Sequence, residues 1–549
     1  MAGVEVELPG AIARPTKEVT AKPDVYVRQT SGLVRTVGSR TALLANLVGM
    51  GIIVNYFWIV FASAGYPNAN LVTTVAIGVL INIGVGYVYW MLASSMPRSG
   101  GDYVFVGRIF HPSIGLATNL VFTVIFATWA GYFAWYTSSV AIPMMLGAYG
   151  VAGGGMQALN MAGWFSGNTN IFIAGAIVLL IVILVALLPT KWIFRVSIGI
   201  FAVSAVIYVA MLVILLTTSQ SAFAADWNAA QASTPGQSYD QLVASLPAGT
   251  IAITAAGTFI GIVYTMLSFI GYANSAYYGG EIRGNPTRAQ GLAIFGAPLI
   301  FAALIAGLYA ATYYTFGRPF IIGLSTGYVS STVSIPAFPS PLFLAAYVVH
   351  NPLFAAFLSF GLVITFFGFS LIYFILPTRN LFAYSFDRIL PTFVARVSRN
   401  GVPWVAVIIL AVAAFISLWV GTYTALLTYL SYANFGFWLA VAIVCLAAAL
   451  FPFLRPDMFS RAPPLVRAKV GKVPILTLVG AASFAASLFV SYAASTAQFV
   501  EPSGAYNYYY LAFLPLVFVV GLAIYGISWA IQRSRGVPVE LISKELPPD

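Results

Sequence analysis

Residues 47–52 read LVGMGI and residues 267–275 read LSFIGYANS. Each stretch places glycine in the middle of a long apolar segment, at Gly49 and Gly51 in the first and at Gly271 in the second. Glycine weakens a helix by about 1 kcal/mol relative to alanine. The two stretches therefore predict two helices that are interrupted near their middle.

The chain around these stretches is too apolar for a soluble protein. Of its 549 residues, 60% are hydrophobic and 7% are charged, whereas an ordinary soluble domain carries about 25% charged residues. The composition also excludes a disordered chain, which would be rich in charge and poor in aromatic residues. We therefore expect an all-α polytopic membrane protein rather than a soluble enzyme or a nucleic-acid-binding protein.

The gaps between charged residues predict where helices cross the membrane. A crossing helix needs about 20 mostly apolar residues to traverse about 30 Å of hydrocarbon. Clusters of glycine, proline, serine and asparagine divide the longer gaps. The sequence thus predicts twelve transmembrane helices, near residues 42–64, 71–95, 113–146, 169–188, 193–217, 250–278, 289–315, 352–376, 403–420, 422–450, 473–495 and 508–531. Residues 218–249 and 316–350 are then expected to be outer loops.

Basic residues predict the orientation of the chain. If the N-terminus is cytoplasmic, 24 of the 25 lysines and arginines fall in the tails or in cytoplasmic loops, and only Arg318 lies outside. Cytoplasmic loops of membrane proteins are rich in these residues. We therefore expect a multi-pass protein of the cell membrane with both termini in the cytoplasm. Residues 1–40 are expected to be a polar tail rather than a signal peptide.

The two interrupted helices are the first and the sixth predicted spans. Glycine-interrupted segments at corresponding positions of two repeats indicate the binding site of a secondary transporter. The spacing predicts a five-plus-five inverted repeat, with residues 41–220 and 250–451 as its halves and 452–531 as two further helices. Residues 221–249 would be an extracellular loop and 532–549 a cytoplasmic tail. The alternative is that the glycines only let helices pack closely.

The middle of every predicted span is free of Asp, Glu, Lys and Arg. A ligand inside the membrane would therefore have to be held by the main chain at the interruptions. Amides at helix N-termini would bind a carboxylate, and unwound carbonyls would bind an ammonium group. An amino acid fits this pair of sites, whereas a strongly cationic substrate would lack a counter-ion.

Few residues in the chain suit catalysis or metal binding. The sequence holds two histidines, His111 and His350, both near predicted membrane borders, and a single cysteine, Cys445, inside a span. These residues cannot form a common His/Cys metal site, and no disulfide can form within the chain. We therefore expect no enzyme activity, no metal site and no cofactor.

Four stretches, in this order along the chain, are similar to motifs of transporters of the amino acid–polyamine–organocation (APC) superfamily. They are GMGI at 49–52, MPRSGGDY at 96–103, FIGY at 269–272 followed by GEIRGNP at 280–286, and Arg379 with FDRILP at 386–391 and GVP at 401–403. The likeness runs from about residue 40 to residue 405, and the later spans agree with it. The chain thus resembles an amino acid permease that alternates between outward-open and inward-open states.

The resemblance also implies a substrate site and a gate. Amides near Gly49, Met50 and Gly51 would bind the carboxylate, carbonyls near Leu47, Leu267 and Ile270 would bind the amine, and Phe269 and Tyr272, beside Gly271, would close the site. Charged residues at predicted cytoplasmic ends would form inner-gate ion pairs: Arg98, Asp102, Glu281, Arg283 and Asp387. Their alternative role is that of ordinary solvated loop charges.

The sequence departs from the superfamily pattern at two places. Ala273 stands where many members carry a glutamate, and the span near 193–217 lacks the lysine found in some proton-coupled members. Sodium-coupled relatives use hydroxyls of the eighth helix, where this chain has Ser359, Thr365 and Ser370. Such hydroxyls more commonly bond their own backbone. The coupling ion, H⁺ or Na⁺, is therefore left open.

These observations together predict a secondary active transporter of amino acids, with neutral ones expected, working by ion-coupled symport or exchange. Within the same class, another small organic amine or a nucleobase remains an alternative substrate. From a different class, a channel or a substrate sensor on the same scaffold is the alternative. The expected partners are a small-molecule substrate and membrane lipid, with no nucleic acid, and the oligomeric state is open.

Overall fold

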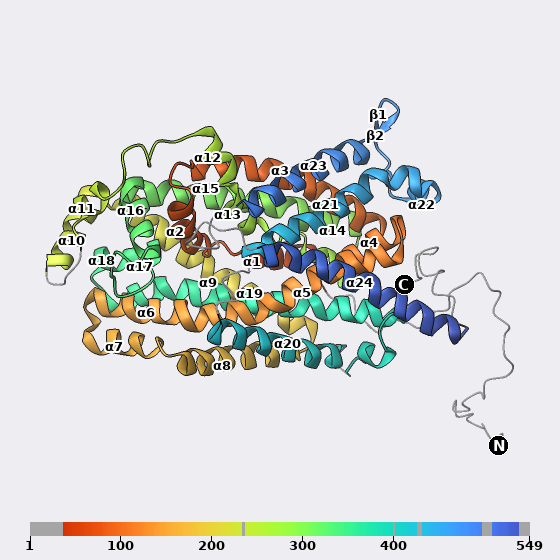
Figure 1. The fold of residues 1–549 in the computed structure, drawn as a ribbon, viewed down its shortest axis with the longest axis horizontal. Coiled ribbons are helices and arrows are strands. Elements are labelled where there is room, and N and C mark those ends of the chain that lie inside the picture. The colour runs from red at the N-terminus through yellow and green to blue at the C-terminus, as the bar shows by residue number, and fades with distance from the viewer. Residues whose placement is uncertain (1–36, 233–236, 399–400, 425–430, 497–507, 537–549) are drawn as a thin grey trace, which may run out of the picture.

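The computed structural model describes residues 37–232, 237–398, 401–424, 431–496 and 508–536. It is a bundle of long helices that run roughly side by side (Figure 1). Strand structure in the described residues is limited to a two-stranded antiparallel hairpin, β1 (Lys469–Val470) and β2 (Val473–Pro474). The expectation of an all-α polytopic membrane protein is confirmed.

Eleven segments of the described residues are long and apolar enough to cross a membrane. They contain these helices: α1 (Ser39–Met50) with α2 (Asn55–Gly65), α3 (Leu71–Ser95), α5 (Pro112–Tyr136) with α6 (Ile142–Tyr149), α8 (Asn168–Ala186), α9 (Thr190–Thr217), α14 (Pro286–Gln290) with α15 (Gly296–Phe316), α19 (Pro352–Phe386), α20 (Trp404–Tyr423), α21 (Ser431–Leu454), α23 (Ile475–Ser495) and α24 (Tyr508–Ser534). Each matches one predicted span.

The remaining predicted span, the sixth, near 250–278, is not a continuous helix. It contains α12 (Ala255–Ile260) and α13 (Ile262–Phe269), which together form the apolar segment Ala255–Phe269. The α-helix ends at Phe269, so the helical segment is shorter than the apolar stretch from which the span was predicted. The interruption predicted from Gly271 is the cause, and it explains why eleven segments rather than twelve reach full length.

Shorter elements join the long helices. They are α4 (Asp102–Ile109), α7 (Met156–Trp164), α10 (Gln220–Ala232), α11 (Tyr239–Ala244), α16 (Arg318–Val329), α17 (Pro341–Leu344), α18 (Ala346–Val349) and α22 (Pro456–Arg461). Short 3₁₀ or π turns are η1 (Thr137–Ala141), η2 (Gly150–Gly154), η3 (Asn274–Ala276), η4 (Gly279–Glu281), η5 (Gly291–Phe295) and η6 (Thr392–Ala395). In Figure 1, α10, α11 and α16–α18 gather at one end of the bundle, and α4, α22 and the hairpin lie toward the other.

Two predicted helix ends were wrong. The span near 113–146 continues to Gly154, and the span near 352–376 continues to Phe386. The second prediction ends the helix before Arg379, because a charged residue commonly marks a membrane border. The guanidinium is paired with a carboxylate inside the protein, so the helix continues past it.

The two predicted outer loops, 218–249 and 316–350, contain helices. Helices α10 and α11 lie in the first and α16, α17 and α18 in the second. Helix α11 begins with a capping box, in which Ser238 and Gln241 bond each other's main chain. The predicted loops were inferred from their Ser, Thr, Gly and Pro residues. Some of these residues, such as Ser238, instead mark the start of a helix.

The core lies around the first span. In its most apolar stretch 89% of the residues are buried, against 22% for α8 and for α24. Those outer helices instead expose large apolar side chains, such as Leu184 on α8 and Leu516 on α24. An exposed apolar surface of this kind is suited to lipid. The predicted tails 1–40 and 532–549 lie mostly outside the described residues.

Helices α5 and α20 approach each other closely at Gly131. A Cβ atom added there would lie 2.1 Å from the carbonyl oxygen of Ala414 and 2.8 Å from the Cβ of Ser417. Helix α24 offers a contrast, because a Cβ on Gly526 would meet no atom within 4 Å.

Gly131→Ala should therefore lower stability by about 1–3 kcal/mol, because α20 has to move away. Gly526→Ala should be neutral or stabilising, since alanine favours the helix. Melting temperatures of the purified variants in detergent measure both effects. Equal melting temperatures for the two variants would contradict the close α5–α20 contact.

Candidate functional site

The first helix break lies where the LVGMGI stretch predicted it. Helix α1 ends at Met50, and Gly51 adopts φ 66°, a left-handed conformation that favours glycine. The chain regains helical structure at Asn55, where α2 begins. A Cβ on Gly51 would lie 2.3 Å from Cζ of Phe369, so a side chain there would require the Phe369 ring to move.

The second break follows α13. Ile270 has extended backbone with ψ 130°, and Gly271 has φ 121°, so the helix cannot continue. The short turn η3 then begins at Asn274. Both interruptions predicted from glycine are confirmed.

The two breaks touch each other. A Cβ on Gly271 would lie 2.5 Å from both the carbonyl carbon and the carbonyl oxygen of Gly49, and 2.9 Å from the amide nitrogen of Met50. Only a residue without a side chain permits this approach. The two stretches, more than 200 residues apart in sequence, therefore form a single site.

Asn46 joins the two broken helices through its side chain. It is fully buried on α1, and its Nδ2 donates to the carbonyl oxygens of Tyr272 and, at 2.9 Å, of Ala293. Its Oδ1 accepts from the main-chain amide of Ser275 at 3.0 Å. One amide group thus satisfies main-chain groups that the unwound segment after α13 exposes. The sequence analysis missed Asn46, although it directly precedes the LVGMGI stretch.

Tyr373 on α19 contacts both breaks. Its hydroxyl lies 2.9 Å from the carbonyl oxygen of Gly49 and 3.4 Å from that of Ile270. Its ring packs against Phe126 and Trp129 of α5, with ring centroids 5.3 Å and 5.0 Å apart. The sequence analysis missed this residue too. The sequence does show the aromatic residues of α5 on the face that Tyr373 packs against, because they recur at helical spacing: Phe122, Phe126, Trp129, Phe133 and Tyr136.

The structure places the predicted substrate-site residues as follows. The carbonyl of Leu47 accepts from the Gly51 amide at 2.9 Å, and that of Leu267 accepts from the Ile270 amide at 3.2 Å. Met50 and Ile270 are buried at the breaks. The carbonyl of Ile270 accepts from the Tyr373 hydroxyl. All three carbonyls that were expected to bind an amine therefore already have a hydrogen-bond donor from the protein.

Phe269 and Tyr272 face away from α19. Phe269 packs edge-on against Phe301 of α15 and lies beside Gly78 of α3, and Tyr272 packs edge-on against Tyr89 of α3. The rings beside the breaks on the α19 side are those of Phe369 and Tyr373. In this conformation, the two aromatic residues that the sequence nominated to close the site line its opposite side.

Two small cavities flank the breaks. One has a volume of about 10 Å³ and lies among residues that include Ala45, Asn274 and Ile372. The other, also about 10 Å³, lies among residues that include Leu47, Gly51 and Thr365. Each has room for about one water molecule. Neither of these two cavities has room for a larger ligand.

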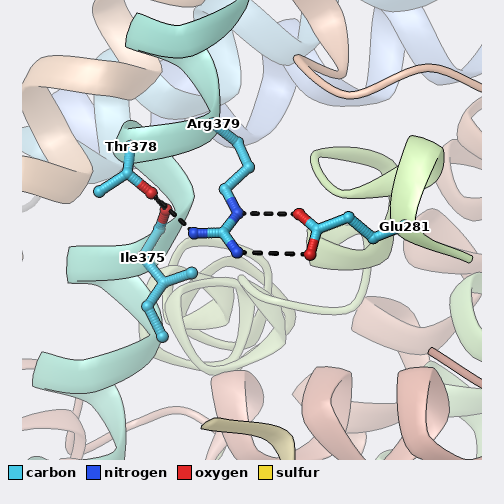
Figure 2. Close-up of polar contacts among 4 residues, drawn as sticks. All are labelled: Glu281, Ile375, Thr378 and Arg379. Carbon is cyan, nitrogen blue, oxygen red and sulfur yellow. Dashed lines mark hydrogen bonds and ion pairs between the residues drawn. The ribbon is translucent and has the colours of Figure 1, made fainter. Parts of the chain in front are cut away.

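A buried ion pair lies between α19 and η4 (Figure 2). Nε of Arg379 is 2.9 Å from Oε1 of Glu281, and its Nη2 is 3.4 Å from Oε2. The side chains are 3% and 1% exposed. Nη1 also donates to the hydroxyl of Thr378 at 3.0 Å. Glu281 was predicted as a gate residue, but its partner Arg379 was named only as part of a motif.

The other predicted gate residues have different surroundings. Asp102 is buried and accepts a hydrogen bond from the Tyr277 hydroxyl, and Asp387 accepts one from Tyr103 at 2.7 Å. The remaining two are less enclosed: Arg98 is half-buried and Arg283 is exposed.

Main-chain pairing accompanies these contacts. The amide of Gly100 donates to the carbonyl of Tyr277 at 3.0 Å, so the turn before α4 is joined to the segment after the second break. The amide of Val37 donates to the carbonyl of Glu281 at 3.0 Å, and that of Arg283 to the carbonyl of Val37 at 2.8 Å. The residue before α1, the turn before α4 and the segment that follows the second break are therefore joined by main-chain hydrogen bonds.

The α19 hydroxyls considered for sodium have protein partners. Thr365 donates to the carbonyl of Gly361 in its own helix at 2.7 Å, Ser370 to that of Ala130 at 2.7 Å, and Ser359 to that of Leu342 at 3.4 Å. Within the described ranges, no group of three or more His, Cys, Asp or Glu side chains could hold a metal ion.

Asp102, which lies outside the crossing segments, has a perturbed carboxyl group. Burial raises its pKa from 3.8 to about 6, while hydrogen bonds from Tyr277 and Tyr89 lower it in part. Because this pKa lies above that of the unfolded chain, the protonated form stabilises the fold. That contribution is complete below about pH 4 and is lost as the pH rises through about 6.

Asp102→Asn should consequently be more stable than the parent protein near pH 7.5, because asparagine carries no charge to bury. The difference in melting temperature should shrink as the pH falls toward about 4. Asp457→Asn, at an exposed position on α22, is the control and should show no such trend. A difference that stays constant with pH would contradict the raised pKa.

Glu281→Gln should destabilise the protein by about 3–5 kcal/mol, because the Arg379 guanidinium would stay buried without a counter-charge. Glu281→Gln combined with Arg379→Gln should recover part of that loss, since no charge then remains. Thermal unfolding in detergent compares the single and the double variant with the parent protein. If the single variant unfolds at the parent temperature, the pair is not buried as described.

The sequence matches a known protein family over most of its length. Residues 36–450 match the family described as Amino acid permease. A shorter similarity, to Uncharacterized protein 399 of Sulfolobus islandicus rod-shaped virus 1, is 29% identical over 83 residues. Those residues are 15% of this chain and 21% of the viral protein. The family match takes in both helix breaks, the residues that join them and the Glu281–Arg379 pair, and the chain belongs to the amino acid permease family.

Proposed function

We propose that this protein is a secondary active transporter that moves amino acids across the membrane by alternating access. The observation that carries the proposal is the contact between the two helix breaks, where the main chain of Gly271 lies against that of Gly49. Unwound backbone inside a membrane is tolerated where it is buried in protein or lines a cavity. A site built from such backbone suits a ligand that has both donors and acceptors.

Contacts on two sides of the breaks support alternation between closed and open states. On one side, the turn before α4 pairs with the segment after the second break, and Glu281 pairs with Arg379. On the other, Phe338 stacks on Phe57 of α2 with ring centroids 4.7 Å apart. Opening either set of contacts alone would expose the site to one side of the membrane.

The chemistry around the breaks favours a neutral amino acid. The nearby side chains of Tyr373, Phe369 and Asn274 are uncharged, and the charges of Glu281 and Arg379 neutralise each other. A zwitterion brings one charge of each sign, which opposite main-chain dipoles can bind. A substrate with a net charge would need a counter-ion, so amino acids with charged side chains should be transported poorly.

The finer expectations from the sequence belong to this proposal. We propose that both termini are cytoplasmic and that residues 41–220 and 250–451 are inverted repeats followed by two further helices. Uptake would be coupled to H⁺ or Na⁺, or would proceed by exchange. The residues near the breaks would bind substrate, and the inner gate would be formed by Arg98, Asp102, Glu281, Arg283 and Asp387.

Uptake into liposomes tests the proposal. Reconstituted protein should accumulate a labelled neutral amino acid above its equilibrium level when a proton or sodium gradient is imposed. Gly271→Ala should abolish this uptake, because a Cβ there collides with the Gly49 peptide group. Gly199→Ala is the matched control, since a Cβ at that helical glycine meets no atom within 4 Å.

The alternatives give different results in the same experiment. A channel would let the label equilibrate without exceeding equilibrium, and a sensor would bind the amino acid without uptake. Accumulation of a nucleobase or of an amine without a carboxylate would change the substrate class. No uptake of any of the twenty amino acids with either ion would contradict the proposal.

A further inference from the structure

The Tyr373 hydroxyl forms a contact that ordinary helix packing does not require. Tyr373 is 2% exposed, and its oxygen lies 2.9 Å from the carbonyl oxygen of Gly49 and 3.4 Å from that of Ile270. A tyrosine hydroxyl has a single hydrogen, so the two carbonyls share one donor. A third element, α19, thus reaches both broken helices at one point.

The two carbonyls belong to helix ends. Gly49 lies in the last turn of α1, which ends at Met50, and Ile270 directly follows α13, which ends at Phe269. The last carbonyls of a helix lack partners within the helix, and this end carries a partial negative charge. Two such ends converge on the Tyr373 hydroxyl. An ammonium group, with three donors and a positive charge, would match this position better than a neutral hydroxyl.

A second buried group, the side-chain amide of Asn274, lies close to Gly49 and lacks a hydrogen-bond partner that a ligand could supply. Nδ2 of Asn274 is buried without a hydrogen-bond partner among the described residues. It would lie 2.4 Å from a Cβ added to Gly49, so it packs directly against that glycine. Buried donors without partners are rare, and each needs an explanation. A ligand with an acceptor group, such as a carboxylate, would provide one.

We propose that Tyr373 occupies the amine subsite in this conformation, so that its hydroxyl takes the position of the substrate's amino group. The inference rests on the proposed function and names one residue that sets its specificity. A substrate with an amino group displaces the hydroxyl from Gly49 and Ile270, and the Asn274 amide is then a donor for its carboxylate. A compound without an amino group leaves the hydroxyl in place.

The surroundings of Tyr373 fit this role. The two small cavities beside the breaks are about 10 Å³ each, so neither admits a ligand while the hydroxyl is in place. The Tyr373 ring stacks on Phe126 and Phe133, with centroids 5.3 Å and 5.9 Å apart. Binding therefore has to move α1 and α13 relative to α5 and α19, which is the motion that would open the site.

Tyr373→Phe tests the inference because it removes the hydroxyl and keeps the ring. The probes are L-leucine and 4-methylpentanoate, which differ only in the amino group, and L-alanine and propionate as a second pair. Isothermal calorimetry of the purified protein measures their Kd values. If Tyr373→Phe is not recovered as a monodisperse protein, Tyr373→Met removes the same donor.

The variant should bind the amino acids about 3- to 10-fold more tightly than the parent, because no hydrogen bond has to be broken first. The acids without an amino group should change less than about 2-fold. Tyr208→Phe is the matched control, since its hydroxyl donates to the carbonyl of Leu304 at 2.8 Å, away from the breaks. Its affinities for both members of each pair should stay within about 2-fold.

The remaining outcomes overturn the inference in distinguishable ways. If the amino acids bind the parent and bind Tyr373→Phe equally or more weakly, the transport proposal stands and Tyr373 is a structural or direct-binding residue. If both members of a pair gain affinity alike, the hydroxyl hinders binding of any ligand and does not distinguish ligands by their amino group. If a screen of all twenty amino acids finds none that binds either protein, the transport proposal fails and this inference with it.

Discussion

The close approach of Gly271 to the peptide group of Gly49 is the constraint on which the rest of the structure depends. At 2.5 Å from an added Cβ to the Gly49 carbonyl, no other residue type fits without moving one of the broken helices. The approach leaves main-chain groups without helical partners in a region that has little room for water. Asn46 and Tyr373 supply part of what is missing, and both are buried. Breaks, side-chain partners and surrounding helices therefore form one unit, in which a change at any member alters the others.

Buried polarity elsewhere follows the same rule, that each group needs a partner. Arg379 and Glu281 neutralise each other, and Asp102 and Asp387 accept hydrogen bonds from tyrosines. These contacts lie between elements that are distant in the sequence, so they hold only while those elements stay together. A buried pair adds little net stability, but the loss of one partner is costly. Such groups are suited to a gate, because their separation requires hydration of both partners at once.

The sequence predicted the fold well wherever a single physical property decides the structure. Apolar length predicted the spans, and glycine inside apolar segments predicted both breaks, because each effect acts locally along the chain. Helix ends at Phe386 and Gly154 were predicted less well, since a charge or a glycine ends a helix only if tertiary contacts allow it. The site was predicted in part. Gly49, Gly51 and Gly271 come together, but Asn46, Tyr373 and the Arg379 partner of Glu281 depend on which side chains face each other. That information lies in the packing of α1, α13 and α19 and not in any one segment.

We propose that the joined breaks form an amine-binding site, and that Tyr373 fills this site in the conformation described here. A structure of the protein with a bound neutral amino acid, determined at a resolution that shows side chains, tests it most directly. The account predicts the ligand's amino group within hydrogen-bond distance of the carbonyl oxygens of Gly49 and Ile270, with the Tyr373 hydroxyl moved away from both. A ligand bound elsewhere, with the Tyr373 hydroxyl still 2.9 Å from the carbonyl oxygen of Gly49 as it is here, would contradict it.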